Sequence, residues 1–131
     1  MDYRDVSELK GRVIKQINVV DDPWEDEAII FRMEDGEVYK MFHIDDCCES
    51  VTINDICGDL DDLIGSPILM AEEVTESGDN EDFESFTWTF YKFATAKGYV
   101  TIRWLGESNG YYSEEVDFVA VKEETGDVGQ G

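Results

Sequence analysis

The sequence has a single histidine, three cysteines and two prolines. No apolar stretch approaches the roughly 20 residues of a membrane-spanning helix, so we expect no membrane contact. The first ten residues, Met1 to Lys10, lack the apolar run of a secretion signal. We therefore expect a cytoplasmic protein with reduced thiols. Three cysteines in such a compartment argue against a disulfide framework.

Basic residues are absent between Met41 and Tyr91, a span that contains fourteen acidic residues. The chain has 32 acidic residues against 10 lysines and arginines, a net charge of −22. Such a field repels nucleic acids, anionic lipids and phosphorylated ligands, and it attracts basic protein surfaces. The alternative is that the acids only keep the protein in solution. If the acids bind a basic protein surface, the expected contact residues are Asp59, Asp61, Asp62, Glu72, Glu73, Glu76, Asp79, Glu81, Asp82 and Glu84.

Hydrophobic residues make up 42% of the chain, enough for a folded core. We expect one compact domain over residues 1–122 and a flexible acidic tail over 123–131. Alternation of apolar and polar residues predicts strands over 12–20, 27–33, 37–42, 50–56, 68–75, 86–93, 99–105 and 111–122. Short helical turns are expected over 5–10 and 58–65, each ended by a glycine. The predicted fold is α+β, a mainly antiparallel, curled sheet with one or two short helices.

All the cysteines and the one histidine fall within fifteen residues, as His43, Cys47, Cys48 and Cys57. Thiolate and imidazole are preferred ligands of Zn²⁺, and four of them fill a tetrahedral shell. The cluster predicts a structural zinc site, either with all four residues or with three and a neighbouring carboxylate. The alternative is that the cysteines are small buried apolar residues and that His43 caps a strand.

The same residues could form a cysteine–histidine nucleophile, as in a cysteine or metal hydrolase. The surrounding acids raise the pKa of a thiol, which works against that chemistry. The sequence also contains neither a phosphate-binding glycine loop nor a serine elbow. We therefore predict no catalytic residue and expect a protein that is not an enzyme.

A second group of residues surrounds a glycine-containing turn near the end of the chain. These residues are Arg103, Trp104, Asn109, Tyr111 and Tyr112. Aromatic rings and an arginine in such a place could form a pocket for a small ligand. The alternative is an ordinary hairpin whose aromatic rings pack in the core and whose arginine pairs with an acid.

Several motifs resemble a family of small phage and prophage proteins known only as a domain of unknown function. They are Asp46-Cys-Cys-Glu-Ser-Val, Gly58-Asp-Leu-Asp-Asp-Leu-Ile-Gly-Ser-Pro, Thr87-Trp-Thr-Phe-Tyr-Lys, Val100-Thr-Ile-Arg-Trp and Glu107-Ser-Asn-Gly-Tyr-Tyr. The likeness covers roughly residues 36–119. The family name implies no activity, so the resemblance assigns no catalytic residue.

In size, charge and class the chain is also similar to type II anti-CRISPR proteins that bind Cas9. This resemblance implies a phage-encoded inhibitor of host defence, acting in the bacterial cytoplasm without direct contact to nucleic acid. Its partner would be a basic nucleic-acid-handling protein such as Cas9, and the inhibitor would block nucleic-acid loading. The alternative is a small-molecule binding module that sequesters a defence signal.

Overall fold

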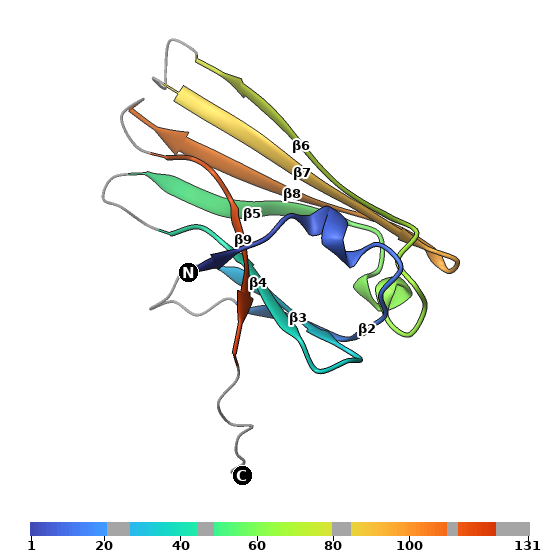
Figure 1. Ribbon diagram of the computed structural model, residues 1–131. Coiled ribbons are helices and arrows are strands. Elements are labelled where there is room, and N and C mark those ends of the chain that lie inside the picture. The colour runs from blue at the N-terminus through green and yellow to red at the C-terminus, as the bar shows by residue number, and fades with distance from the viewer. Residues whose placement is uncertain (21–26, 45–48, 80–84, 110–112, 123–131) are drawn as a thin grey trace.

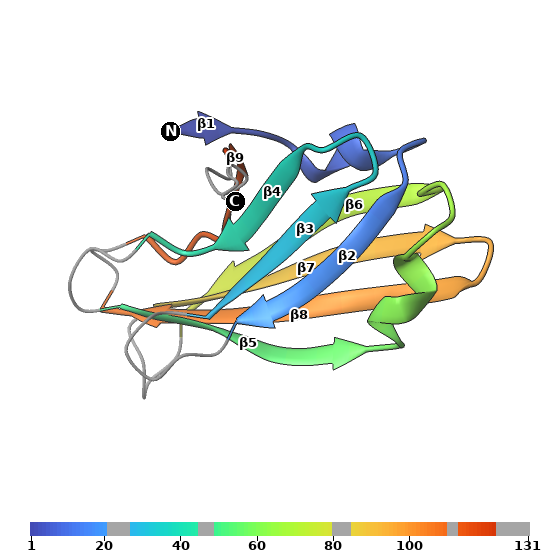
Figure 2. The ribbon, with the colours of Figure 1, turned by 90° about the horizontal axis from the view of Figure 1, so that it is seen from below.

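Two antiparallel sheets face each other in the computed structural model, which describes residues 1–20, 27–44, 49–79, 85–109 and 113–122 (Figure 1). The five-stranded sheet contains β1 (Asp2–Tyr3), β9 (Asp117–Val121), β4 (Val38–Phe42), β3 (Ala28–Met33) and β2 (Ile14–Val20), in that order. The four-stranded sheet contains β5 (Ser50–Cys57), β8 (Gly98–Ser108), β7 (Ser85–Thr95) and β6 (Met70–Gly78). Figure 2 shows the first sheet lying across the second.

The core lies between the sheets and receives every second side chain of their central strands. Ile29, Phe31 and Met33 of β3 are at most 2% exposed, as their alternation in the sequence predicts. From the other sheet, Phe93 and Ile102 are fully buried. Because side chains alternate between the two faces of a strand, one face of each sheet is apolar.

The prediction of an α+β fold is wrong, because the structure is essentially all-β. The helical residues of the described chain form two 3-10 turns, η1 (Val6–Leu9) and η2 (Leu60–Leu63). Asp5 and Asp59 cap these turns through their side chains, and Gly11 and Gly65 follow them with positive φ angles. A turn of four residues is too short to bury an amphipathic stripe of its own.

The eight predicted strands are present as β2 to β9, with shifted boundaries. β1, a two-residue strand that pairs with β9, was not predicted from the sequence. The expected tail, residues 123–131, lies outside the described residues. In the described part of the chain, no helix is long and apolar enough to cross a membrane.

The two turns and the segments beside them connect the sheets along one side. Gly11 N donates to Ile68 O at 2.7 Å, and Ile68 N donates to Arg12 O at 2.9 Å. Further along, Gly65 N donates to Ile14 O at 2.9 Å. These hydrogen bonds join the start of β2 to the segment that leads into β6, so the two sheets hold a fixed relative position.

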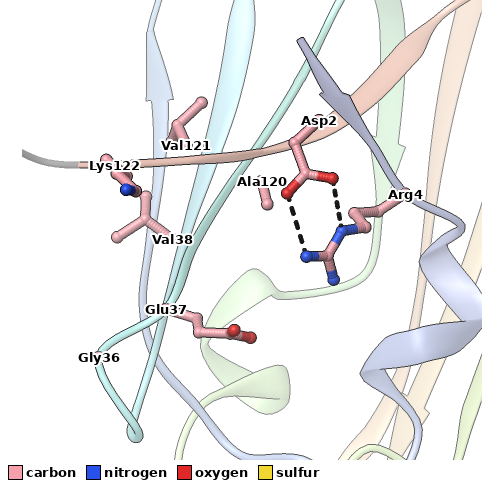
Figure 3. Close-up of a pocket in the computed structure, with 8 residues that line it drawn as sticks. All are labelled: Asp2, Arg4, Gly36, Glu37, Val38, Ala120, Val121 and Lys122. Carbon is pink, nitrogen blue, oxygen red and sulfur yellow. Dashed lines mark hydrogen bonds and ion pairs between the residues drawn. The ribbon is translucent and has the colours of Figure 1, made fainter.

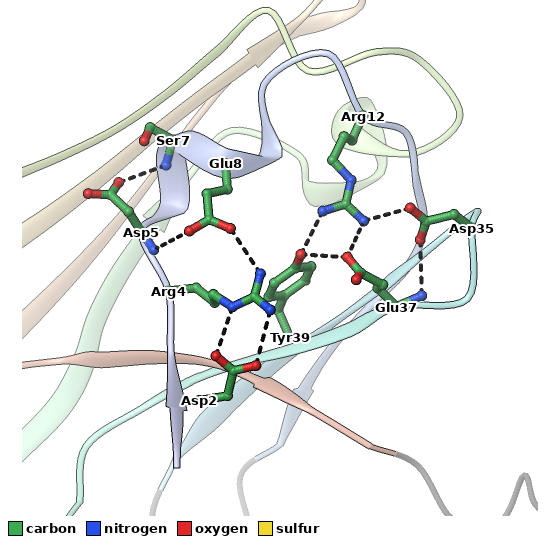
Figure 4. A network of polar contacts seen from close by, with 9 residues as sticks. All are labelled: Asp2, Arg4, Asp5, Ser7, Glu8, Arg12, Asp35, Glu37 and Tyr39. Carbon is green, nitrogen blue, oxygen red and sulfur yellow. Dashed lines mark hydrogen bonds and ion pairs between the residues drawn. The ribbon is translucent and has the colours of Figure 1, made fainter.

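Arg12 draws together three oxygen-bearing side chains at the hairpin between β3 and β4 (Figure 4). Its guanidinium donates to the Tyr39 hydroxyl at 2.6 Å, and to the carboxylates of Asp35 and Glu37 at 2.7 Å each. Arg4 likewise bridges carboxylates on either side of it. Arginine suits this task because its planar fork holds several donors in fixed directions. In this region Arg4 and Arg12 each donate hydrogen bonds to two carboxylates.

Gly58 allows a close approach between β5 and β8 that a side chain would prevent. Its φ is +103°, and a Cβ atom there would collide with the carbonyl oxygen of Tyr99. Gly36 has a similar φ of +95°, but a Cβ there would meet nothing within 4 Å. We expect Gly36→Ala to destabilise the fold by about 1 kcal/mol through backbone strain alone.

Gly58→Ala should cost at least about 2 kcal/mol more than Gly36→Ala, because it adds a steric collision to the same strain. Urea unfolding of both variants beside the native protein measures the difference. Equal losses in the two variants would show that the approach of β5 to β8 is not tight.

Candidate partner-binding surface

Strand β7 divides its side chains cleanly between the core and the outer surface. Thr89, Tyr91 and Phe93 point inward and are 1% exposed or less. Phe86, Trp88 and Phe90 lie between them in the sequence and are half-buried on the outer face of the sheet. Outer faces of sandwich sheets are normally polar. Three aromatic residues in a row on a central strand are therefore an unusual apolar surface.

Neighbouring strands extend this aromatic row sideways. On β6, Val74 lies opposite Phe90, and on β8, Leu105 lies opposite Trp88. The Trp88 and Phe90 rings stack with their centroids 6.4 Å apart, and the Arg103 guanidinium lies 5.3 Å from the Trp88 ring. We call this surface the aromatic face; it consists of Val74, Phe86, Trp88, Phe90, Arg103 and Leu105.

Acidic side chains lie beside the aromatic face on the neighbouring strands β5, β6 and β8, and Lys92 continues the outward row on β7. Glu72 and Glu76 alternate with Val74 on β6, and Glu76 lies directly opposite Trp88. Glu107 on β8 lies opposite Phe86, and Asp55 on β5 lies opposite Arg103. Tightly binding interfaces commonly have aromatic and arginine residues at the centre and a charged rim. The arrangement fits a partner that offers apolar groups within a basic surrounding.

The acids predicted as partner contacts do not form one face. Glu72 and Glu76 lie beside the aromatic face, whereas Glu73 points to the opposite side of β6. Asp61 and Asp62 belong to η2, and Asp59 caps it, near the turn at the other end of β7. Asp79 follows β6, and the three remaining acids, Glu81, Asp82 and Glu84, lie outside the described residues.

His43 is buried and makes two hydrogen bonds to other parts of the chain. Its Nδ1 donates to the carbonyl oxygen of Glu115 at 2.7 Å, and its Nε2 lies 2.7 Å from Oε2 of Glu49. The side chains of His43 and Glu49 are at most 1% exposed. Both ring nitrogens therefore face protein oxygen atoms, which leaves no lone pair directed at a metal ion.

Cys57 lies at the far end of β5 from His43. Glu49, the partner of His43, precedes β5, and Cys57 ends it eight residues later, roughly 26 Å away along an extended strand. The predicted four-residue zinc shell therefore does not form with both His43 and Cys57. Cys47 and Cys48 lie outside the described residues, and zinc binding by them stays a prediction. Among the described residues, no three His, Cys, Asp or Glu side chains gather as metal ligands.

Cys57 is also poorly suited to act as a nucleophile. Its thiol donates to Oδ2 of Asp55 at 3.3 Å. This hydrogen bond, together with the charge of Asp55, raises the pKa of the Cys57 thiol. A raised pKa lowers the fraction of thiolate at neutral pH. Because His43 lies at the other end of β5, the cysteine–histidine pair that such chemistry needs is not formed by these two residues.

The residues of the predicted small-molecule pocket point to different places. Trp104 faces the core and is 1% exposed, whereas Arg103 lies on the outer face and donates to the side chain of Asn54 at 2.9 Å. Adjacent residues of a strand face opposite sides, so these two cannot line one pocket. Asn109 is exposed, and Tyr111 and Tyr112 lie outside the described residues.

A cavity of about 510 Å³ lies between β1, the β3–β4 hairpin and β9 (Figure 3). Asp2 and Arg4 pair with each other in its wall, and Glu37 bonds to Arg12 and Tyr39. The acids and the arginine that line it are thus already engaged in hydrogen bonds. The cavity contains no feature that selects a particular ligand.

The fold and its surface define a small, strongly acidic β-sandwich with an aromatic outer face. Residues 7–118 match the family model described as Domain of unknown function (DUF7448), so the chain belongs to that family. No curated protein and no solved structure matches the chain.

We expect His43→Ala to lower the free energy of unfolding by about 3 kcal/mol. The substitution removes both hydrogen bonds and leaves the buried Glu49 carboxylate without its imidazole partner. Glu49→Gln should cost less, because the amide still offers a hydrogen-bonding group without a buried charge. Urea unfolding, with elemental analysis of zinc in each purified protein, checks this role. A loss of zinc in His43→Ala would contradict it and restore the histidine as a ligand.

We also expect Glu73 to destabilise the protein at neutral pH. Burial, followed by the nearby charges of Asp5, Glu115 and Asp117, raises the pKa of Glu73 in the folded state. A raised folded pKa gives a stabilisation that is complete below the unfolded value, about 4.3, and disappears as pH rises through the folded value. Glu73→Gln should therefore raise the melting temperature at pH 7, and the gain should vanish below about pH 4.

The matched control for this pH dependence is Glu72→Gln. It removes the same charge from the outward side of the same strand, opposite Lys92. An equal, pH-dependent gain in both variants would attribute the effect to overall charge rather than to the surroundings of Glu73.

Proposed function

We propose that this protein is a non-enzymatic inhibitor that binds a basic surface of a nucleic-acid-handling protein through its aromatic face. The observation that carries the proposal is the outward row of Phe86, Trp88 and Phe90, with Glu72 and Glu76 beside it. Stacked aromatic rings supply contact area with little loss of side-chain entropy, and the acids select a basic partner.

The proposed partner is Cas9. A Cas9-type protein holds its guide–target duplex in a positively charged channel that recognises shape and backbone rather than sequence. A rigid, acidic sandwich with a net charge of −22 would be drawn to such a channel over long range. Bound there, it would block the loading of nucleic acid. The resemblance of several motifs to those of small phage proteins is the support for a phage origin and for action in the bacterial cytoplasm.

Substitutions on the aromatic face should weaken binding more than equal charge changes elsewhere on the protein. We expect Trp88→Ala to weaken binding to purified Cas9 about 30-fold, because central aromatic contacts commonly carry about 2 kcal/mol. The paired reversal Glu72→Lys and Glu76→Lys should weaken it more. Biolayer interferometry with Cas9, before and after loading of guide RNA, measures both effects. Weaker binding to loaded Cas9 is expected if the two ligands compete.

The paired reversal Asp61→Lys and Asp62→Lys is the matched control, because it makes the same charge change on η2 at the other end of the sheet. It should weaken binding only slightly, through the long-range field. Equal losses in the two pairs would assign binding to overall charge and overturn the aromatic face as the contact. Absence of binding to Cas9 by the native protein would overturn this choice of partner.

A further inference from the structure

The inner side of β6 and β7 is polar at one end, where the inner face of a sandwich is normally apolar. Three cross-strand pairs line it: Glu73 with Tyr91, Thr75 with Thr89, and Ser77 with Thr87. Five of these six positions carry a hydroxyl group and the sixth carries a carboxylate. These strands face Glu115 and Val116, in the segment before β9, instead of a strand of the five-stranded sheet.

A groove of about 320 Å³ lies over these pairs. It is lined by Glu73, Thr75, Ser77, Thr87, Thr89, Glu115 and Val116. Glu115 and Val116 come from the segment before β9 and form the opposite wall. From Glu73 to Ser77 the floor runs four residues along one strand, roughly 13 Å. The groove therefore extends along β6, which is an edge strand of its sheet.

Thr89 forms part of the groove floor with an unused hydroxyl. The residue is 1% exposed, and no hydrogen bond to its side chain is found among the described residues. Its neighbour across the strands, Trp104, also has a buried Nε1 with no partner in the described chain. Buried polar groups are normally paired, so an unpaired one that opens onto a groove points to a ligand.

The groove offers acceptors and few free donors. Thr87 Oγ1 donates to Glu114 at 2.7 Å, so the 3.0 Å contact between Ser77 and Thr87 is donated by Ser77. The hydroxyl protons of Ser77 and Thr87 are thus used, while their lone pairs remain. Glu73 and Glu115 add carboxylates, and Asp5 and Asp117 lie close enough to Glu73 to act on its charge. The matching ligand carries positive charge and several N–H donors.

We propose that this groove binds a linear aliphatic polyamine. One ammonium group lies between Glu73 and Glu115, and the chain extends along the hydroxyl-lined floor, where a second ammonium group donates to Thr89 and Thr75. The length of the floor favours an elongated polycation over a single ion. This groove and the aromatic face lie on opposite sides of β6, so the two proposals fail independently.

The test is isothermal titration of the purified chain with spermidine at low ionic strength. Native protein should bind one spermidine. Glu73→Gln should weaken binding at least about tenfold, because it removes a charge-assisted hydrogen bond. Thr89→Val preserves the shape of the floor and removes its hydroxyl, and should weaken binding about fivefold. Glu72→Gln, on the outward side of β6, should leave the affinity unchanged.

Two arms separate the polyamine from other cations. Mg²⁺ at matched ionic strength should not displace spermidine, since it cannot span the groove. A lysine side chain of a partner protein offers the same ammonium chemistry, but the titration contains no partner, so heat from spermidine alone identifies the free amine. If the Thr89→Val protein does not melt cooperatively, Thr75→Val is used in its place. Thr75 is the cross-strand partner of Thr89 and is more exposed.

No heat from native protein would overturn the proposal. It would also be overturned if Glu72→Gln weakened binding as much as Glu73→Gln did, or if Mg²⁺ displaced spermidine. Either result would reduce the groove to part of a diffuse negative field.

Discussion

The contact of Phe31 with Phe93 and Phe118 holds the two sheets together at the centre of the core. Phe31 and Phe118 belong to the five-stranded sheet, and Phe93 belongs to the four-stranded one. The ring centroids of Phe31 lie 6.0 Å from Phe93 and 5.9 Å from Phe118, and Tyr39 stacks on Phe118 at 5.2 Å. Buried aromatic pairs add specific geometry to a large apolar area. They fix which side of each strand faces inward.

This constraint explains how so acidic a chain folds. The negative charge of 32 acids resists compaction, and the burial of both inner faces must exceed that repulsion. Among the described residues, most acids accordingly lie on edges, turns and outer faces. Two of the exceptions have dedicated partners: Glu49 faces His43, and Glu114 accepts hydroxyl hydrogen bonds from Thr87 and Ser108. Glu73, on the inner side of β6, has a raised pKa instead. A buried carboxylate without such partners would be costly.

The same constraint produces two candidate binding surfaces from one pair of strands. Because the core holds Tyr91 and Phe93 inside, the aromatic row of β7 must face outward. Opposite the segment before β9, the inner side carries hydroxyls and Glu73, which form a groove instead of core. β6 supplies acids to both surfaces, Glu72 and Glu76 to one and Glu73 to the other. A single stretch of acids in the sequence thus serves two different environments.

The positions of the strands could be predicted from the sequence because alternation is a local property of each strand. The alternation of Phe86, Trp88 and Phe90 with Thr87, Thr89 and Tyr91 predicted β7, but residue types alone would place the aromatic side inward. His43 and Cys57 were likewise predicted to share a site, because residues that are close in the sequence are often close in the fold. The tertiary structure separates them by the length of β5. The position of a strand thus follows from local pattern. Which side of the strand is buried, and which residues lie close together, depend on how the two sheets pack, because only packing removes one side of a strand from water.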